Sequence, residues 1–192
     1  MQVGLFFGSF NPIHIGHLAI ANYILESSEL DQVWFIVSPQ NPFKNKANLL
    51  PEYHRLELVN RAIDNDLRFR ASSIEFSLPK PSYTVDTIAY LKEKYPSHEM
   101  KIIMGSDQLL SFHKWKNPDQ LRKLVRFIVY PRPDSDYHKL LDSPEFELIK
   151  APLMEISSSF IRESIRNNKD VRYFLHPEVW KYIREMNFYI KK

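Results

Sequence analysis

Cysteine is absent from this chain of 192 residues, and glycine is scarce, with only four. Without cysteine the chain has no disulfide, no thiolate ligand for a metal ion and no cysteine nucleophile. Long apolar runs are missing too, since no stretch approaches the roughly 20 residues that span a bilayer. The first residues, MQVGLFFG, lack the basic start and the long apolar segment of a secretory signal. These absences lead us to expect a cytoplasmic protein that does not enter a membrane.

An excess of one charge is also lacking. The formal net charge is +3, and the lysines and arginines are dispersed along the chain, which argues against a nucleic-acid-binding surface. Hydrophobic residues make up 44% and charged residues 26%, as is typical of folded globular proteins. The length indicates one domain over residues 1–192, with a helical C-terminal segment of about residues 157–192 packed on the core.

Short apolar runs alternate with amphipathic segments along the chain. Strands are expected at residues 3–7, 32–38, 67–71, 74–76, 101–104, 127–130 and 146–149. Helices are expected at residues 16–27, 51–63, 84–95 and 118–125, and in two or three pieces from residue 157. This alternation predicts an α/β fold, a Rossmann-like, doubly wound and mainly parallel sheet with helices on both faces. Ligands of such folds bind beyond the carboxyl ends of the strands, so the segments that follow strands are the candidate site.

The segment GSFNPIHIGH, residues 8–17, follows the first expected strand and opens the first helix. Free backbone amides at a helix start bind phosphate groups. His14 and His17 are three residues apart, which puts both imidazoles near one face of the entry turn, where they can stabilise charge on a leaving pyrophosphate. Gly16 would let a nucleotide approach the backbone closely. Two other interpretations are a zinc-binding pair, which lacks further ligands, and two surface histidines at a helix start.

This segment resembles the HxGH signature of the nucleotidylyltransferase superfamily, whose small members carry GGTFDPxHxGH after their first strand. The chain keeps the second glycine, the phenylalanine, the proline and both histidines, and has Phe7, Ser9 and Asn11 at the substituted positions. The resemblance implies that His14 and His17 are catalytic. The residues of this loop that it implies for ATP binding are Gly8, Ser9, Phe10, Gly16 and His17.

The segment ISSSFIR, residues 156–162, resembles the ISSTxIR signature that the same superfamily carries near the far end of the chain. Ser157 suits an N-cap, and Arg162 falls on the same helix face as Ser158 and Ser159, where it can clamp a triphosphate. A capped surface helix with an incidental arginine would explain the segment alone, but its pairing with HxGH favours the functional interpretation. The resemblance implies that Arg162 is catalytic, and that Ile156, Ser157, Ser158 and Arg162 bind ATP.

Two middle segments resemble elements of the bacterial nicotinate-mononucleotide adenylyltransferases. PSYTVDT, residues 81–87, is similar to their SYTxDTL element, which implies that Tyr83 and Thr84 bind the nicotinate nucleotide. Thr84 is also a candidate helix cap, a sufficient structural reason for its presence. GSDQL, residues 105–109, is similar to their GxDxL element, which implies that Gly105 and Asp107 contact ATP. A helix N-cap is the alternative role for Asp107.

Three further positions are carried over from the same family. Trp115 lies where the family has a tryptophan that stacks on the pyridine ring, although a lone tryptophan is more often a core residue. PQNPFK, residues 39–44, resembles a PPHK loop, which implies that Asn41 and Lys44 bind the nicotinate nucleotide; a solvated loop lysine is the alternative for Lys44. YPRPD, residues 130–134, resembles an RPG-type turn that directs Arg132 to the same substrate.

The resemblance as a whole implies an enzyme of NAD biosynthesis. Such an enzyme transfers the adenylyl group of ATP to nicotinate mononucleotide and releases deamido-NAD and pyrophosphate. No carboxylate cluster suggests a metal cage, so Mg²⁺ would be held by substrate and water, with no metal-ligating residue. Small molecules would be the partners, without nucleic acid or membrane, and a homo-oligomer is possible. The alternatives are a nicotinamide-mononucleotide or phosphopantetheine adenylyltransferase, a non-catalytic nucleotide-binding protein of the same fold, and a zinc hydrolase.

Overall fold

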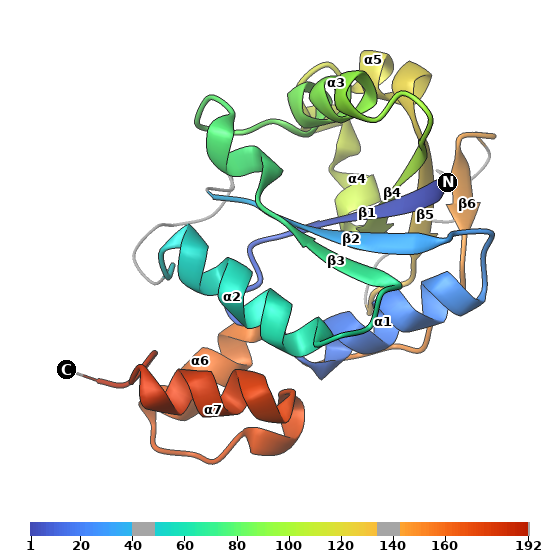
Figure 1. Ribbon diagram of the computed structural model, residues 1–192. Coiled ribbons are helices and arrows are strands. Elements are labelled where there is room, and N and C mark those ends of the chain that lie inside the picture. Colours follow the sequence, from blue (N-terminus) through green and yellow to red (C-terminus); the bar gives the residue numbers. More distant parts are fainter. Residues whose placement is uncertain (40–48, 134–142, 192) are drawn as a thin grey trace.

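The computed structural model describes residues 1–39, 49–133 and 143–191. Its centre is a six-stranded sheet in the order β3-β2-β1-β4-β5-β6, and every pair of neighbouring strands is parallel (Figure 1). The strands are β1 (Gln2–Gly8), β2 (Gln32–Val37), β3 (Phe69–Ser72), β4 (Glu99–Gly105), β5 (Arg126–Tyr130) and β6 (Phe146–Leu148). The parallel α/β sheet predicted from the sequence is confirmed.

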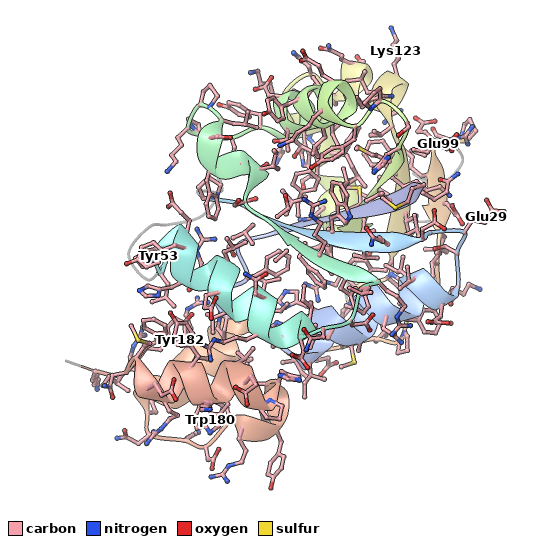
Figure 2. All side chains as sticks on the ribbon, viewed as in Figure 1. Glu29, Tyr53, Glu99, Lys123, Trp180 and Tyr182 are labelled. Carbon is pink, nitrogen blue, oxygen red and sulfur yellow. The ribbon has the colours of Figure 1, made fainter. Side chains whose placement is uncertain are left out.

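Helices cover both faces of this sheet, as predicted. On one face lie α1 (Ile15–Glu26) and α2 (Glu52–Ile63), and on the other lie α3 (Thr84–Lys94), α4 (Ser106–Leu110) and α5 (Pro118–Leu124) (Figure 1). The C-terminal helices α6 (Ser158–Arg166) and α7 (Pro177–Glu185), joined through the 3-10 turn η5 (Arg172–Phe174), pack beside α2. In Figure 2 Tyr182 reaches from α7 towards α2, where its hydroxyl lies 2.9 Å from His54 Nδ1.

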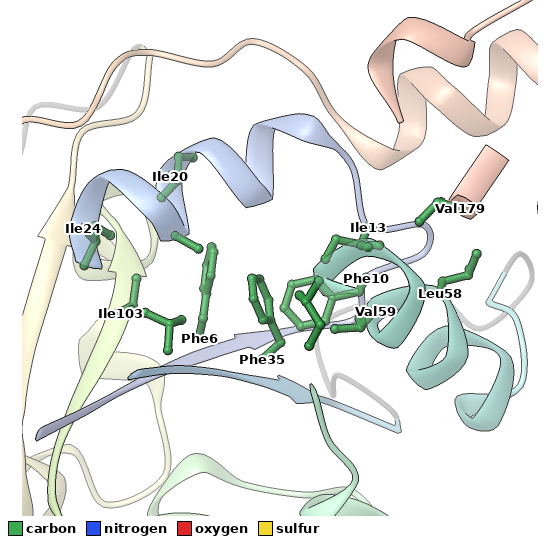
Figure 3. Close-up of a cluster of buried hydrophobic side chains, with 14 of the residues drawn as sticks. Phe6, Phe10, Ile13, Ile20, Ile24, Phe35, Leu58, Val59, Ile103 and Val179 are labelled. Carbon is green, nitrogen blue, oxygen red and sulfur yellow. The ribbon is translucent and has the colours of Figure 1, made fainter. Parts of the chain in front are cut away.

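The two faces of the sheet bury separate apolar clusters because successive strand residues point to opposite sides. Leu5 faces the helices α3 to α5, whereas its neighbour Phe6 faces α1 and α2. Figure 3 shows the second cluster, in which Phe6, Phe10 and Phe35 pack against residues of α1 and α2. Val179 of α7 belongs to this cluster as well, so the C-terminal helices share their core with the first loop.

The strand order reverses at β1. The chain moves outward from β1 to β2 and β3, and then returns to the other side of β1 with β4. The crevice beyond the carboxyl ends of β1 and β4 is the place where doubly wound folds bind their ligands. The two segments that follow these strands are the glycine-containing segments at residues 8–17 and 105–109.

One predicted strand is absent, and two of the alternative roles considered above are wrong. Residues 74–76 do not form a strand, because β3 ends at Ser72 and the chain then forms the 3-10 helix η2 (Ile74–Ser77), which turns the Glu75 side chain into the interior. Thr84 does not cap α3; Tyr83 holds that position because its carbonyl oxygen accepts the first helical hydrogen bonds. Asp107 does not cap α4, since the helix starts directly after Gly105 and leaves Asp107 in its first turn.

Among the residues that the structure describes, no helix has the length and apolar character needed to cross a membrane.

Candidate active site

The two histidines of the first loop stack on each other at the start of α1. Their ring centroids lie 3.8 Å apart, and the planes are inclined by 31°. His14 holds the N-cap position, and its backbone N–H donates to His17 Nδ1 at 3.3 Å. Because Nδ1 accepts this bond, the proton of the neutral His17 ring is on Nε2. The fold therefore fixes the tautomer of His17 and makes Nε2 its hydrogen-bond donor.

His14 is buried, with 5% of its surface exposed. Burial, together with the positive charge of Arg132, lowers the pKa of His14 to about 3. Its Nδ1 atom is buried and has no hydrogen-bond partner among the described residues. A Cβ atom on Gly16 would lie 3.0 Å from this Nδ1, so the glycine leaves room for the imidazole. His14 is therefore a neutral ring in the folded protein near pH 7.

The depressed pKa of His14 predicts a pH dependence of stability. Unfolded His14 takes up a proton near pH 6.5, whereas folded His14 stays neutral down to about pH 3. Stability is therefore lost as the pH falls through this window, by up to about 1.4 kcal/mol per pH unit from this group. We expect His14→Gln to remove that share of the slope in urea unfolding measured from pH 7 to pH 4. His113→Gln, at an exposed position, should keep the wild-type slope, and an unchanged slope in His14→Gln would contradict the assignment.

The ISSSFIR segment docks on the first loop. Arg162 Nη1 donates to the carbonyl oxygen of Asn11 at 2.8 Å, and the Ser158 hydroxyl donates to the carbonyl oxygen of Pro12 at 2.8 Å. Arg162 Nη2 also donates to the Ser159 hydroxyl at 3.1 Å. The helix face predicted from the spacing is confirmed, and the two superfamily signatures meet although Arg162 and Asn11 are 151 positions apart.

Ser157 caps α6 as predicted, because its hydroxyl accepts the Phe160 backbone N–H at 3.1 Å. Ile156, just before the cap, is partly buried against the core. Tyr189, near the end of the chain, also reaches the first loop, because its hydroxyl donates to Asn11 Oδ1 at 2.9 Å. The C-terminal segment thus holds the first loop by several hydrogen bonds.

The segment after β4 contacts the segment after β5. The Arg132 backbone N–H donates to the Ser106 hydroxyl at 2.8 Å, and Arg132 Nε lies 3.9 Å from Asp107 Oδ1. Arg132 also contributes to the lowered pKa of His14. Arg132 therefore lies with the residues predicted to bind ATP, and its assignment to the nicotinate nucleotide remains a prediction.

Gly105 provides a steric test of this segment. A Cβ atom at Gly105 would overlap Asp107 Oδ1 and lie 3.0 Å from Arg132 Cγ. We expect Gly105→Val to displace both side chains and raise the KM for ATP at least tenfold, while circular dichroism shows a folded protein. Gly4→Ala serves as the comparison, because the nearest atoms to its Cβ would be those of the core residues Leu30 and Ile103. It should lower stability without altering the KM for ATP. An unchanged KM in Gly105→Val would remove Gly105 from the ATP site.

Tyr83 and Trp115 lie on the α3 face of the sheet, where both are partly buried against the same apolar cluster. The Lys116 ammonium lies 4.6 Å from the centre of the Tyr83 ring and 2.8 Å from Asp86 Oδ2. Trp115 packs on Phe112 with 5.4 Å between ring centroids. The fold thus joins the PSYTVDT segment to the Trp115 segment. Thr84, half-buried, is the first residue of α3.

Two predicted residues, Asn41 and Lys44, lie outside the described residues. Two others in the interior were not anticipated, Arg55 and Glu75, which are 0% and 2% exposed. Arg55 had a usable signal, because it shares the buried face of α2 with Leu58 and Val59 at helical spacing. Glu75 had none, since its burial follows from the 3-10 turn that the sequence did not reveal. Within the described parts of the chain, no group of three His, Cys, Asp or Glu side chains could hold a metal ion.

Comparison with known proteins gives consistent matches. The family model described as cytidylyltransferase-like matches residues 5–164. A protein of Flavobacterium psychrophilum, named "Probable nicotinate-nucleotide adenylyltransferase", is 51% identical over 100% of both chains. A protein of the same name from Cytophaga hutchinsonii is 50% identical over 98% of both chains. The chain belongs to the nicotinate-nucleotide adenylyltransferase family. The family resemblance drawn from the motifs is therefore confirmed.

The fold of this nicotinate-nucleotide adenylyltransferase family member also matches solved structures. The nicotinic acid mononucleotide adenylyltransferase of Plasmodium falciparum, complexed with NaAD, superposes with a TM-score of 0.84 at 23% identity, over 98% of this chain and 97% of that one. The same enzyme complexed with APC gives a TM-score of 0.83 at 22% identity, over 98% and 96%. At this level of identity the match confirms the nucleotidylyltransferase fold.

Proposed function

We propose that this protein transfers the adenylyl group of ATP to nicotinate mononucleotide, forming deamido-NAD and pyrophosphate. The observation that carries the proposal is the hydrogen bond from Arg162 to the Asn11 carbonyl oxygen. It joins a fixed positive charge to the loop of His14 and His17 at the point where the strand order reverses. Amide donors, imidazoles and a guanidinium at one helix entrance suit a triphosphate.

In the reaction, an oxygen of the nicotinate mononucleotide phosphate attacks the α-phosphorus of ATP. The new O–P bond forms as the bond from the α-phosphorus to the bridging oxygen breaks, and pyrophosphate carries away the negative charge. His17 Nε2–H and Arg162 donate to the phosphate oxygens where this charge grows. His14 is neutral, so its ring contributes a dipole beside the phosphates and does not act as an acid. No covalent enzyme intermediate is needed, so catalysis depends on positioning and charge stabilisation.

We also propose Mg²⁺ as a companion of the triphosphate. The carboxylate of Asp107 faces Arg132 at 3.9 Å, and no metal-binding trio occurs among the described residues, which fits an ion held by phosphate oxygens and water. When bound, the ion would neutralise charge on the phosphates. We expect the enzyme to act in the cytoplasm, and light scattering after size-exclusion chromatography would establish whether it is a monomer or a homo-oligomer.

For the acceptor, the aromatic side chains of Tyr83 and Trp115 would hold the pyridine ring. Thr84 would contribute its hydroxyl and its amide at the start of α3, where the positive end of the helix favours the carboxylate of nicotinate. This electrostatic preference favours nicotinate over nicotinamide mononucleotide.

A pyrophosphate-release assay tests the proposal. ATP would be combined with nicotinate mononucleotide, nicotinamide mononucleotide or phosphopantetheine, and kcat/KM compared among the three. We expect the highest value for nicotinate mononucleotide, at least tenfold above the amide. Activity confined to phosphopantetheine would keep the chemistry but overturn the substrate, and no pyrophosphate with any acceptor would favour a non-catalytic nucleotide-binding protein.

A further inference from the structure

Two buried charged side chains, Arg55 of α2 and Glu75 of η2, lie outside the signature segments. Burial of a charge costs several kcal/mol unless hydrogen bonds compensate for the lost water. Both side chains are almost fully buried, so the contacts that compensate each charge indicate what it holds together.

Arg55 binds backbone carbonyl oxygens from three segments. Its Nη1 donates to Ser9 and to Ser38, each at 2.7 Å. Nη2 donates to Pro39 at 3.0 Å, and Nε donates to Leu50 at 2.8 Å. The guanidinium fork thus fastens the loop after β1 to the chain after β2 and to the approach to α2. A lysine ammonium could not span these positions, because its donors radiate from one nitrogen.

The Glu75 carboxyl group is likewise hydrogen-bonded, in its case to hydroxyl groups. Its carboxyl oxygens accept the Ser82 hydroxyl at 2.9 Å and the Thr87 hydroxyl at 2.8 Å. The Ser38 side chain also hydrogen-bonds to this carboxyl group. Ser82 directly precedes Tyr83 and Thr84, so Glu75 holds the turn that presents the residues predicted to bind the nicotinate nucleotide.

Ser38 joins the two clusters. Its carbonyl oxygen accepts from Arg55, its side chain bonds to Glu75, and its backbone N–H donates to the Gly8 carbonyl oxygen at 2.9 Å. We propose that Arg55 and Glu75 are positioning residues that act through Ser38 to hold the loop at Ser9 and the turn at Ser82 in a fixed relation. This inference rests on the proposed function, in which the first segment binds ATP and the second binds the acceptor.

The physical reason lies in the reaction geometry. An in-line attack requires the two substrates to be aligned, and a misplacement of about 1 Å can cost about 100-fold in rate. Each substrate contacts a different loop, and loops are mobile unless they are fastened to the scaffold. Hydrogen bonds to charged groups are stronger than those between neutral groups. Arg55, Ser38 and Glu75, which link Ser9 to Ser82, would supply the alignment without themselves touching either substrate.

Conservative variants separate this role from general stability. We expect Arg55→Lys to raise the KM for ATP and Glu75→Gln to raise the KM for nicotinate mononucleotide, each about tenfold or more, with kcat lowered in both. Matched controls on α2 are Arg61→Lys and Glu57→Gln, which alter a partly exposed ion pair and should leave both KM values unchanged. Wild-type KM values in Arg55→Lys and Glu75→Gln, or a lower melting temperature with both KM values unchanged, would overturn the proposal.

A double-mutant cycle tests the link through Ser38. Arg55→Lys and Glu75→Gln disturb the same alignment. The variant that carries both should therefore lose less kcat/KM than the product of the two single losses. In a Ser38→Ala background the losses of kcat/KM from Arg55→Lys and Glu75→Gln should multiply, because residue 38 then has no hydroxyl to bond to Glu75. If the two losses of kcat/KM multiply in the protein that keeps Ser38, the proposed link between Arg55 and Glu75 through Ser38 is refuted. Should Arg55→Lys not fold, Ser38→Ala alone removes one hydroxyl group and is expected to raise the KM for the acceptor.

Hydrogen exchange gives a readout that does not depend on activity. In Arg55→Lys the backbone amides of Asp86 and Thr87, which donate to the Tyr83 carbonyl oxygen, should exchange faster, although Arg55 does not contact them, while the Arg61→Lys protein keeps wild-type rates. Unchanged exchange at these amides contradicts the positioning role even if the enzyme is active. If the wild-type protein instead releases no pyrophosphate with any acceptor, the proposed function fails, and the exchange result still decides whether the two segments are coupled.

Discussion

His17→Ala is expected to lower kcat/KM by about 10²–10³-fold while the melting temperature falls by only about 2–4 °C. The loss in rate follows from the tautomer that the fold imposes. The His14 backbone N–H occupies His17 Nδ1, so the donor hydrogen of the neutral ring is on Nε2. A preorganised donor of this kind is worth more in the transition state than in the ground state, because negative charge grows on the leaving phosphates.

The effect of His17→Ala on stability should be small. The ring is half-buried, and its edge contacts with Phe10 and Phe6 have centroid distances of 5.2 and 6.1 Å. The loss of these contacts costs about 1 kcal/mol, which sets the expected shift in melting temperature. Steady-state kinetics and thermal unfolding measured on the same preparation separate the two effects.

His98→Ala is the matched control for this experiment. His98 immediately precedes β4 at the amino ends of the strands and stacks on Tyr95, away from the first loop. It should show the wild-type kcat/KM. His17→Asn keeps an N–H donor and should recover part of the lost rate. A His17→Ala protein with the full rate would remove His17 from the mechanism.

Arg162→Ala should have an effect of similar size, a loss of about 10²–10³-fold in kcat/KM for ATP. The guanidinium is half-buried, and burial lowers its pKa without neutralising it, so its charge acts where solvent screening is reduced. Its bonds to the Asn11 carbonyl oxygen and the Ser159 hydroxyl fix the fork beside the first loop. Removal of this charge leaves the transferred and leaving phosphates less well neutralised.

Two comparisons separate the charge of Arg162 from its structural contacts. Ser158→Ala removes the second bond between α6 and the first loop but keeps the charge, and should cost less than tenfold. Arg162→Lys keeps the charge without the fork and should fall between Ser158→Ala and Arg162→Ala. Arg172→Ala, which removes an exposed ion pair with Asp170, should leave kcat/KM unchanged. Equal losses in Ser158→Ala and Arg162→Ala would mean that Arg162 acts only by docking the helix.

The element pattern was largely predictable because strand and helix periodicity depends on neighbouring residues. The apolar runs at residues 32–38 and 101–104 became β2 and β4, and Ser157 capped α6 as its hydroxyl suggested. Residues 74–76 do not form a strand, because their conformation depends on residues that are distant in the sequence. Ile74 packs on the apolar cluster of the α3 face and Phe76 on the cluster of the α1 face, and the buried Glu75 between them is stabilised by hydroxyl groups that come later in the chain.

For the candidate site too, some features follow from the sequence and others depend on the tertiary structure. By its motifs, the sequence alone determined the family and the parallel α/β fold. It also predicted which residues bind the triphosphate, with the scarce glycines Gly8, Gly16 and Gly105 next to them. The tertiary structure decided that Gly16 accommodates the His14 imidazole and that Gly8 accommodates the Phe10 ring, since a Cβ at either would crowd these rings. It also decided that Arg132 lies beside Asp107.

Only the fold could bring Arg162 to Asn11, across 151 positions, or make Ser38 the meeting point of Arg55 and Glu75. The physical reason is the distance along the chain over which each interaction acts. Backbone sterics, capping and periodicity act within a few residues and are therefore legible in the sequence, whereas strand order and the burial of a charge depend on what the whole chain packs around it.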